Sequence, residues 1–124
     1  SQAPIPDFVL RACAKLALQG LAHQHPDQCS INEYLPGEGM SAHVDALPFA
    51  DGISILTLGS TCEIEFIHSA SGEIRRFTPE VGSAMFLTGV SRYEWVHGIQ
   101  ARWNDGGIPR QRRISLVTRK KHPD

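Results

Sequence analysis

The sequence predicts a mainly β domain of the jelly-roll or small-sandwich type, preceded by one α-helix. The opening residues carry apolar side chains at helical spacing, whereas from residue 29 onward short β-prone runs follow one another. Glycine, proline, aspartate and serine separate these runs, as they do in turns. The 124 residues contain no long linker and no internal repeat, so we expect one domain over residues 1–124.

The helix is predicted over about residues 4–21. Phe8, Leu10 and Leu18 are among the residues that supply its apolar surface, and Asp7 stands in its first turn. Gly20 falls where a helix stop is expected.

The β core is predicted over about residues 28–120. Its expected strands are residues 29–35, 43–46, 52–58, 62–68, 73–78, 83–88, 94–99 and 112–119. Ser69 to Gly72 is short enough to close a hairpin, and the runs on either side of it alternate polar with apolar residues. We therefore expect these two runs to be half-exposed neighbours.

Composition excludes several classes of protein. No apolar run reaches the roughly 18 residues that a membrane helix needs, and no basic leader precedes an apolar segment. The three cysteines form no CxxC pair, which favours a reduced, intracellular protein of the cytoplasm or nucleus. Separately, we expect the protein to be a monomer. Net charge is −1, but six basic residues gather near the end of the chain, either as a solvated strand or as a phosphate-binding edge. They are Arg110, Arg112, Arg113, Arg119, Lys120 and Lys121.

The sharpest local pattern is His43-Val44-Asp45. Residues two apart on a strand share a face, so the imidazole and the carboxylate should project together. His97 supplies a third ligand, and two histidines with one carboxylate form the facial triad of non-haem Fe(II) oxygenases, which leaves positions open for substrates. Alone, His-x-Asp is a weak signal, and a lone His97 is more often a core histidine.

A second pattern lies near the C-terminus, where Arg113, Ser115 and Arg119 share one face of a predicted strand. The planar guanidinium suits a dicarboxylate, although two arginines on an edge strand also serve solubility. Asn32 and Tyr34 form a further same-face pair that can donate to a bound keto acid, while Tyr34 alone is as consistent with packing.

Together these residues resemble the AlkB family of 2-oxoglutarate oxygenases, in order and spacing, over about residues 26–120. The matching elements are Asn32-x-Tyr34, Pro36-Gly37, His43-x-Asp45, Ser91-Arg92, His97-Gly98-Ile99 and Arg113 with Arg119. The resemblance implies a double-stranded β-helix, which is a jelly-roll core, and an Fe(II)- and 2-oxoglutarate-dependent dioxygenase.

The resemblance also implies a role for each residue. His43, Asp45 and His97 would bind Fe(II). Asn32, Tyr34 and Arg113 would hold 2-oxoglutarate, with Arg113 on its distal carboxylate, Arg119 near its metal-bound end and Ser115 on the same wall. Arg92 would be a catalytic-pocket residue on the substrate side. Such enzymes convert 2-oxoglutarate and O2 to succinate and CO2 while they hydroxylate a C–H bond; a hydroxylated N-methyl group is lost as formaldehyde.

Within the family, the chain is most similar to the branch that hydroxylates modified wobble uridine in tRNA, so the expected partner is RNA, tRNA first. After His43-x-Asp45 the sequence continues Ala46-Leu47-Pro48, without the second acid typical of DNA-repair members. Because the sequence starts at the helix before the core, we also expect it to lack most or all of the family's N-terminal nucleotide-recognition lid.

Several alternatives stay open. The same site could demethylate a nucleic acid base or a protein side chain. A cupin-like or lectin-like sandwich could bind a ligand without redox chemistry, and a truncated core could keep the metal but not the substrate. The loops at residues 47–51 and 102–110 are expected to border the site, with Trp103 either stacking there or packing.

Overall fold

The computed structural model describes residues 4–45 and 49–122. In chain order its elements are α1 (Asp7–Ala17), β1 (Gln28–Tyr34), β2 (Met40–His43), β3 (Ile53–Leu58), β4 (Ile64–His68), β5 (Ile74–Phe77), β6 (Ala84–Leu87), α2 (Gly89–Tyr93), β7 (Trp95–Ile99), β8 (Asn104–Asp105), β9 (Ile108–Pro109) and β10 (Arg113–Arg119).

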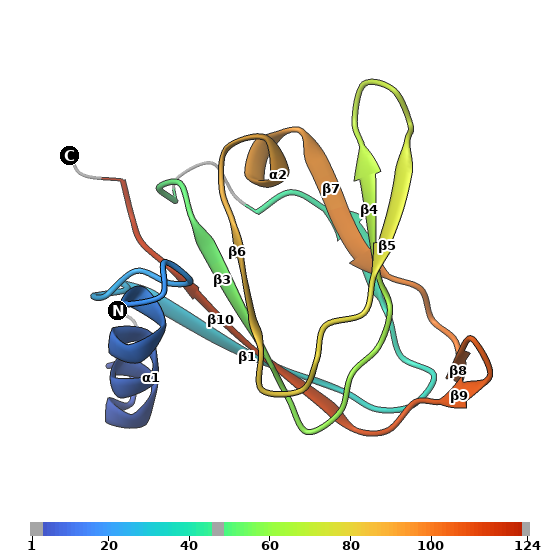
Figure 1. The fold of residues 1–124 in the computed structure, drawn as a ribbon, viewed down its shortest axis with the longest axis horizontal. Coiled ribbons are helices and arrows are strands. Elements are labelled where there is room, and N and C mark those ends of the chain that lie inside the picture. The colour runs from blue at the N-terminus through green and yellow to red at the C-terminus, as the bar shows by residue number, and fades with distance from the viewer. Residues whose placement is uncertain (1–3, 46–48, 123–124) are drawn as a thin grey trace.

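Eight of these strands form two antiparallel sheets that face each other (Figure 1). The first sheet has the order β1-β10-β3-β6, and the second has the order β2-β7-β4-β5. The chain passes back and forth between the two sheets, which is the connectivity of a jelly roll. The predicted double-stranded β-helix is confirmed.

The first sheet is apolar on both faces. Ile53, Ile55 and Val117 point toward the second sheet and pack with Phe66, which that sheet contributes. On the opposite face, Leu116 packs against Val9, Cys13 and Ala22, so α1 covers the outside of the sheet (Figure 1). This arrangement leaves the space between the sheets for a binding site.

The helices differ from the prediction in extent and number. The predicted helix over residues 4–21 is shorter, Asp7–Ala17, although Gly20 does end it with φ +72° and the Leu21 amide donates to the Leu16 carbonyl at 2.9 Å. The five-residue helix α2 was not predicted, because so short a segment has no periodicity to detect. Within the described residues, no helix has the length and apolar character that a bilayer crossing requires.

The strand predicted over residues 43–46 is displaced. β2 covers Met40–His43 instead, so His43 is its last residue and Asp45 follows it. The predicted Ala46 lies outside the described residues. Strand alternation therefore does not place Asp45 beside His43; the irregular segment that follows β2 does.

β2 and β7 approach each other unusually closely. A Cβ atom at Gly98 would lie 2.8 Å from the Ala42 backbone, and one at Gly39 would lie 2.4 Å from the Ile99 carbonyl oxygen. The register between the strands also shifts between Met40 and His43. The missing side chains therefore permit a strand pairing that ordinary residues would push apart.

Candidate functional site

A cavity of about 50 Å³ lies between the two sheets, and its wall contains all but one of the predicted site residues. These are Asn32, Tyr34, His43, Asp45, His97, Arg113, Ser115 and Arg119. Apolar side chains, which the sequence analysis did not assign to the site, complete the wall: Met40, Ile55, Ile64, Ile99 and Val117. The fold thus brings the predicted polar groups together in a largely apolar setting.

The three predicted metal ligands lie side by side. His43 and His97 are directly paired across β2 and β7, with ring centroids 4.6 Å apart. His43 Nε2 lies 3.7 Å from Asp45 Oδ1, and both His97 and Asp45 are buried. Two imidazoles and one carboxylate are a donor set that fits Fe(II).

His43 is oriented by its own strand. Its Nδ1 lies 3.0 Å from the Ser41 carbonyl oxygen, which only accepts hydrogen bonds, so Nδ1 carries the proton. Nε2, on the side of Asp45, is then left with a lone pair. This is the outer contact that metal-binding histidines normally have.

Asp45 is at present turned toward a cation. Arg119 donates to Asp45 Oδ1 at 2.9 Å and also contacts Gln28 and Ser30. Within residues 4–45 and 49–122, no three His, Cys, Asp or Glu side chains are arranged to hold a metal ion as they stand. Metal binding at these residues therefore requires Asp45 to share or release its contact with Arg119.

Burial keeps His97 neutral. Burial first, and the nearby His43 second, lower the pKa of His97 to about 4, while Asp45 opposes the shift. At neutral pH the ring is therefore uncharged, which is the form that binds a metal.

Arg113 is a buried cation at another part of the cavity wall. Its side chain is 2% exposed, donates to the Thr57 hydroxyl at 3.1 Å and lies 5.5 Å from the Tyr34 ring centroid. Its Nε has no hydrogen-bond partner, and no carboxylate pairs with it in the described part of the chain. A buried, unpaired guanidinium is costly, so the site is suited to a ligand that brings a carboxylate.

The remaining polar residues surround that cation. Burial raises the pKa of Tyr34, against the opposing effect of Arg113, so the phenol stays a hydrogen-bond donor. Asn32 donates to the Ser115 hydroxyl at 3.5 Å, a long contact that leaves the amide available to a ligand. This part of the site can therefore surround an anionic group with neutral donors.

Arg92 is the predicted site residue that the cavity wall lacks. It lies on α2, is 2% exposed and donates to the Asp45 backbone carbonyl at 2.9 Å, with its guanidinium over the Tyr93 ring. The structure therefore places the Arg92 guanidinium against the backbone of a predicted metal ligand, and its predicted role on the substrate side stays a prediction.

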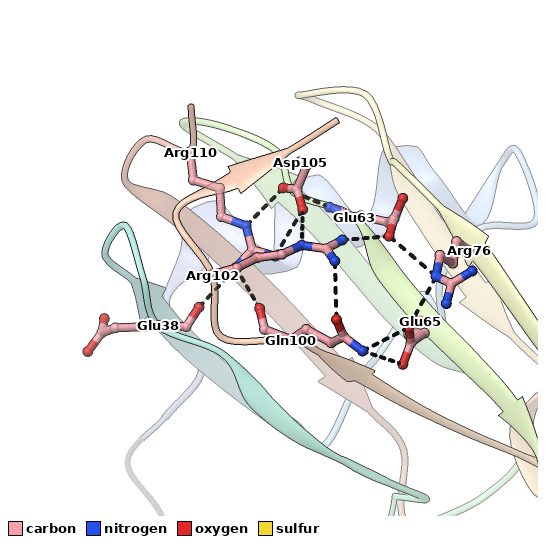
Figure 2. Close-up of polar contacts among 8 residues, drawn as sticks. All are labelled: Glu38, Glu63, Glu65, Arg76, Gln100, Arg102, Asp105 and Arg110. Carbon is pink, nitrogen blue, oxygen red and sulfur yellow. Dashed lines mark hydrogen bonds and ion pairs between the residues drawn. The ribbon is translucent and has the colours of Figure 1, made fainter. Parts of the chain in front are cut away.

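The basic C-terminal residues do not form a free edge. Arg112, Arg119 and Lys120 pair with carboxylates, and Arg113 lines the cavity. Arg110 is buried and pairs with Asp105, within the polar network of Figure 2. Most of the residues proposed for a phosphate-binding edge are therefore engaged in ion pairs or in the cavity wall.

Trp103 also lies away from the cavity. It is 67% exposed, and its ring would be 3.0 Å from a Cβ atom at Gly37, so it lies over that glycine. The predicted loop at residues 102–110 contains the β8-β9 hairpin, which is not part of the cavity wall. Residues 46–48 of the other predicted loop lie outside the described residues.

Sequence relatives point to one enzyme family. The family model described as the 2OG-Fe(II) oxygenase superfamily matches residues 1–119. A Xenopus tropicalis protein named tRNA (carboxymethyluridine(34)-5-O)-methyltransferase alkbh8 is 38% identical over 79% of this chain, which covers 16% of that protein. Uncharacterized protein L905 of Acanthamoeba polyphaga mimivirus is 33% identical over 93% of this chain and 58% of its own length. The chain thus spans only a small part of the first of these relatives.

Solved structures agree on the fold. The structure of OsALKBH1 superposes with a TM-score of 0.74 at 20% identity and covers 97% of this chain and 68% of its own. A Pseudomonas putida prolyl-4-hydroxylase superposes with a TM-score of 0.61 at 20% identity, over all of this chain and 70% of its own. These matches are consistent with the predicted resemblance to the AlkB family. The chain belongs to the 2OG-Fe(II) oxygenase superfamily of dioxygenases, whose cofactors are Fe(II) and 2-oxoglutarate with O2.

Proposed function

We propose that this chain hydroxylates RNA, with the wobble uridine of tRNA as first choice, in an Fe(II)- and 2-oxoglutarate-dependent reaction. One observation supports the site above all: an unpaired buried guanidinium, Arg113, shares a cavity with His43, Asp45 and His97. An iron chelated by a 2-oxo dicarboxylate would fit these groups, with the donors at one part of the wall and the distal carboxylate on the cation.

The residues of the chain then have distinct tasks. His43, Asp45 and His97 would hold Fe(II), which with 2-oxoglutarate and O2 supplies the oxidising chemistry. Arg113 would bind the distal carboxylate, with Tyr34 and Asn32 as neutral donors. Arg119, now on Asp45, would turn to the metal-bound end of 2-oxoglutarate. The five apolar residues of the wall would help to keep water from the reacting groups, and Arg92 holds the Asp45 backbone.

Two observations support the choice of RNA. The similar Xenopus protein is named for tRNA and for uridine 34, and a mouse protein of the same name is 38% identical over 80% of this chain. The methyl transfer in that name is not oxygenase chemistry, and this chain covers only 16% of each protein. The proposal therefore takes the tRNA position from the name and the reaction from the site.

Mass spectrometry of nucleosides tests the proposal. The purified chain is incubated with Fe(II), 2-oxoglutarate, O2 and total tRNA, and we expect one oxygen atom to be added to a wobble uridine derivative while succinate accumulates. Release of formaldehyde with loss of a methyl group would favour the alternative, demethylation. Succinate formation without any change in RNA would contradict an RNA substrate, and the absence of 2-oxoglutarate turnover would favour a ligand-binding sandwich.

A further inference from the structure

The faces of β4 and β7 that border the cavity continue beyond it. Phe66 pairs with His97 across these strands, and the next same-face pair is His68 with Trp95. The rings of the first pair are 6.0 Å apart and those of the second are 5.0 Å apart, so both pairs are in contact on one face. Two residues along a strand span about 7 Å, which places Trp95 one step beyond His97.

Trp95 is not used by the hydrophobic core. It belongs to none of the three buried clusters among the described residues, and it remains partly exposed. It also lies two residues after the end of α2, whose Arg92 holds the backbone of Asp45. A partly exposed indole beside a predicted metal ligand is therefore in a position to meet a substrate.

His68 holds the indole in place. The Ser71 amide donates to His68 Nδ1 at 3.2 Å, so the proton is on Nε2, which lies 3.4 Å from Glu94 Oε1. The Trp95 ring meets this fixed imidazole at 66°. A side chain that is already ordered loses little conformational entropy when a ligand binds.

We propose that Trp95, supported by His68, is the stacking platform for a nucleobase of the RNA substrate. The inference rests on the proposed function, because stacking needs a substrate with planar rings. It supplies what the cavity itself lacks, since the cavity wall bears no indole. An indole binds bases of any sequence through its ring face.

Tryptophan fluorescence tests the platform, because the chain has only two tryptophans. In Trp103→Phe, Trp95 is the one remaining indole; in Trp95→Phe, Trp103 is. A single-stranded uridine-containing RNA oligonucleotide is added to protein loaded with Fe(II) and 2-oxoglutarate under anaerobic conditions. We expect the RNA to quench the tryptophan fluorescence of Trp103→Phe but not that of Trp95→Phe. Trp95→Ala should weaken RNA binding about 5- to 150-fold, the effect of one stacked base, and His68→Ala should weaken it less.

The outcomes separate the platform from the function. If wild-type protein modifies RNA while Trp95 is not quenched, the platform is wrong and the proposed function stands. Quenching of Trp103 instead would also overturn it, by moving the stacked base to the β8-β9 side. If RNA neither binds nor changes, both proposals fail. Circular dichroism of Trp95→Phe and Trp95→Ala checks that the fold is retained.

Discussion

Charged side chains are held in opposite ways on the outer face of the second sheet and in the cavity between the two sheets. On the outer face and the adjoining β8-β9 hairpin, Arg110 binds both carboxylate oxygens of Asp105 and two backbone carbonyls, and Arg102 joins Asp105 to Glu63 (Figure 2). On the inner side, facing this sheet across the cavity, Arg113 has no carboxylate among the described residues. A satisfied network serves the fold, whereas an unsatisfied buried cation marks the place of a ligand.

The largest effect should come from a predicted metal ligand in the cavity. We expect His43→Ala to reduce succinate formation at least about 1000-fold, beyond the 10- to 100-fold usual for groups that only support a ligand. The exposed His25→Ala is the matched control and should keep wild-type turnover. Substantial turnover in His43→Ala would contradict the metal assignment.

A pair of arginine variants compares the outer network, through Arg110, directly with the cavity, through Arg113. Arg110→Met should lower the free energy of unfolding by about 3 kcal/mol, because it leaves Asp105 without its main partner. Arg113→Met should leave that free energy within about 1 kcal/mol of wild type, since it removes a buried charge that has no carboxylate partner among the described residues.

Ligand binding should give the reverse order. In thermal unfolding with Mn²⁺, 2-oxoglutarate should raise the Tm of wild type and Arg110→Met but not that of Arg113→Met. If both substitutions lowered the free energy of unfolding equally, and 2-oxoglutarate still raised the Tm of both variants, the distinction between the outer network and the cavity would be wrong.

Acidification should test the outer network alone. Arg110 holds the pKa of Asp105 at about 2, below its ordinary 3.8, with Arg102 adding to the effect and burial opposing it. Because the folded-state value is depressed, the stabilisation is complete above pH 3.8 and is lost as the pH falls toward 2. In denaturant titrations across this pH interval, the free energy of unfolding of Asp105→Asn should fall by about 2 kcal/mol less than that of wild type. Parallel pH curves for the two proteins would show that the pair contributes nothing.

A smaller effect, on metal affinity, is expected from a substitution at Gly98, where β7 lies against the backbone of β2. An alanine there would place its Cβ 2.8 Å from the Ala42 backbone and push β2 from β7, and with it His43 from His97. We expect Gly98→Ala to weaken Mn²⁺ binding about tenfold, measured by isothermal titration, because donor geometry controls affinity. Unchanged affinity would mean that the strands move without disturbing the donors.

Much of the inner face could be predicted from local sequence. The single-residue alternation of β10 correctly placed Arg113, Ser115 and Arg119 on one wall, because a regular strand has period two. His43 and Asp45 do meet, but across a strand end that alternation does not describe.

The outer network and the Arg92 contact could not be predicted in the same way. Arg110 looked like a surface charge because its carbonyl partners, on Glu38 and Gln100, come from other elements. Arg92 reaches Asp45 across 47 positions through a helix too short to leave a pattern. The pairing of His68 with Trp95 likewise depends on strand register, which a single sequence does not encode locally.

The missing side chain at Gly98 has a consequence for the transfer of this predicted site into another protein. Copying the predicted ligands His43, Asp45 and His97 onto a different β-sandwich transfers the donor atoms but not the register shift between β2 and β7 that accompanies two imidazole rings 4.6 Å apart. The graft must carry the glycines as well, because a Cβ atom at Gly98 would meet the Ala42 backbone in that irregular pairing.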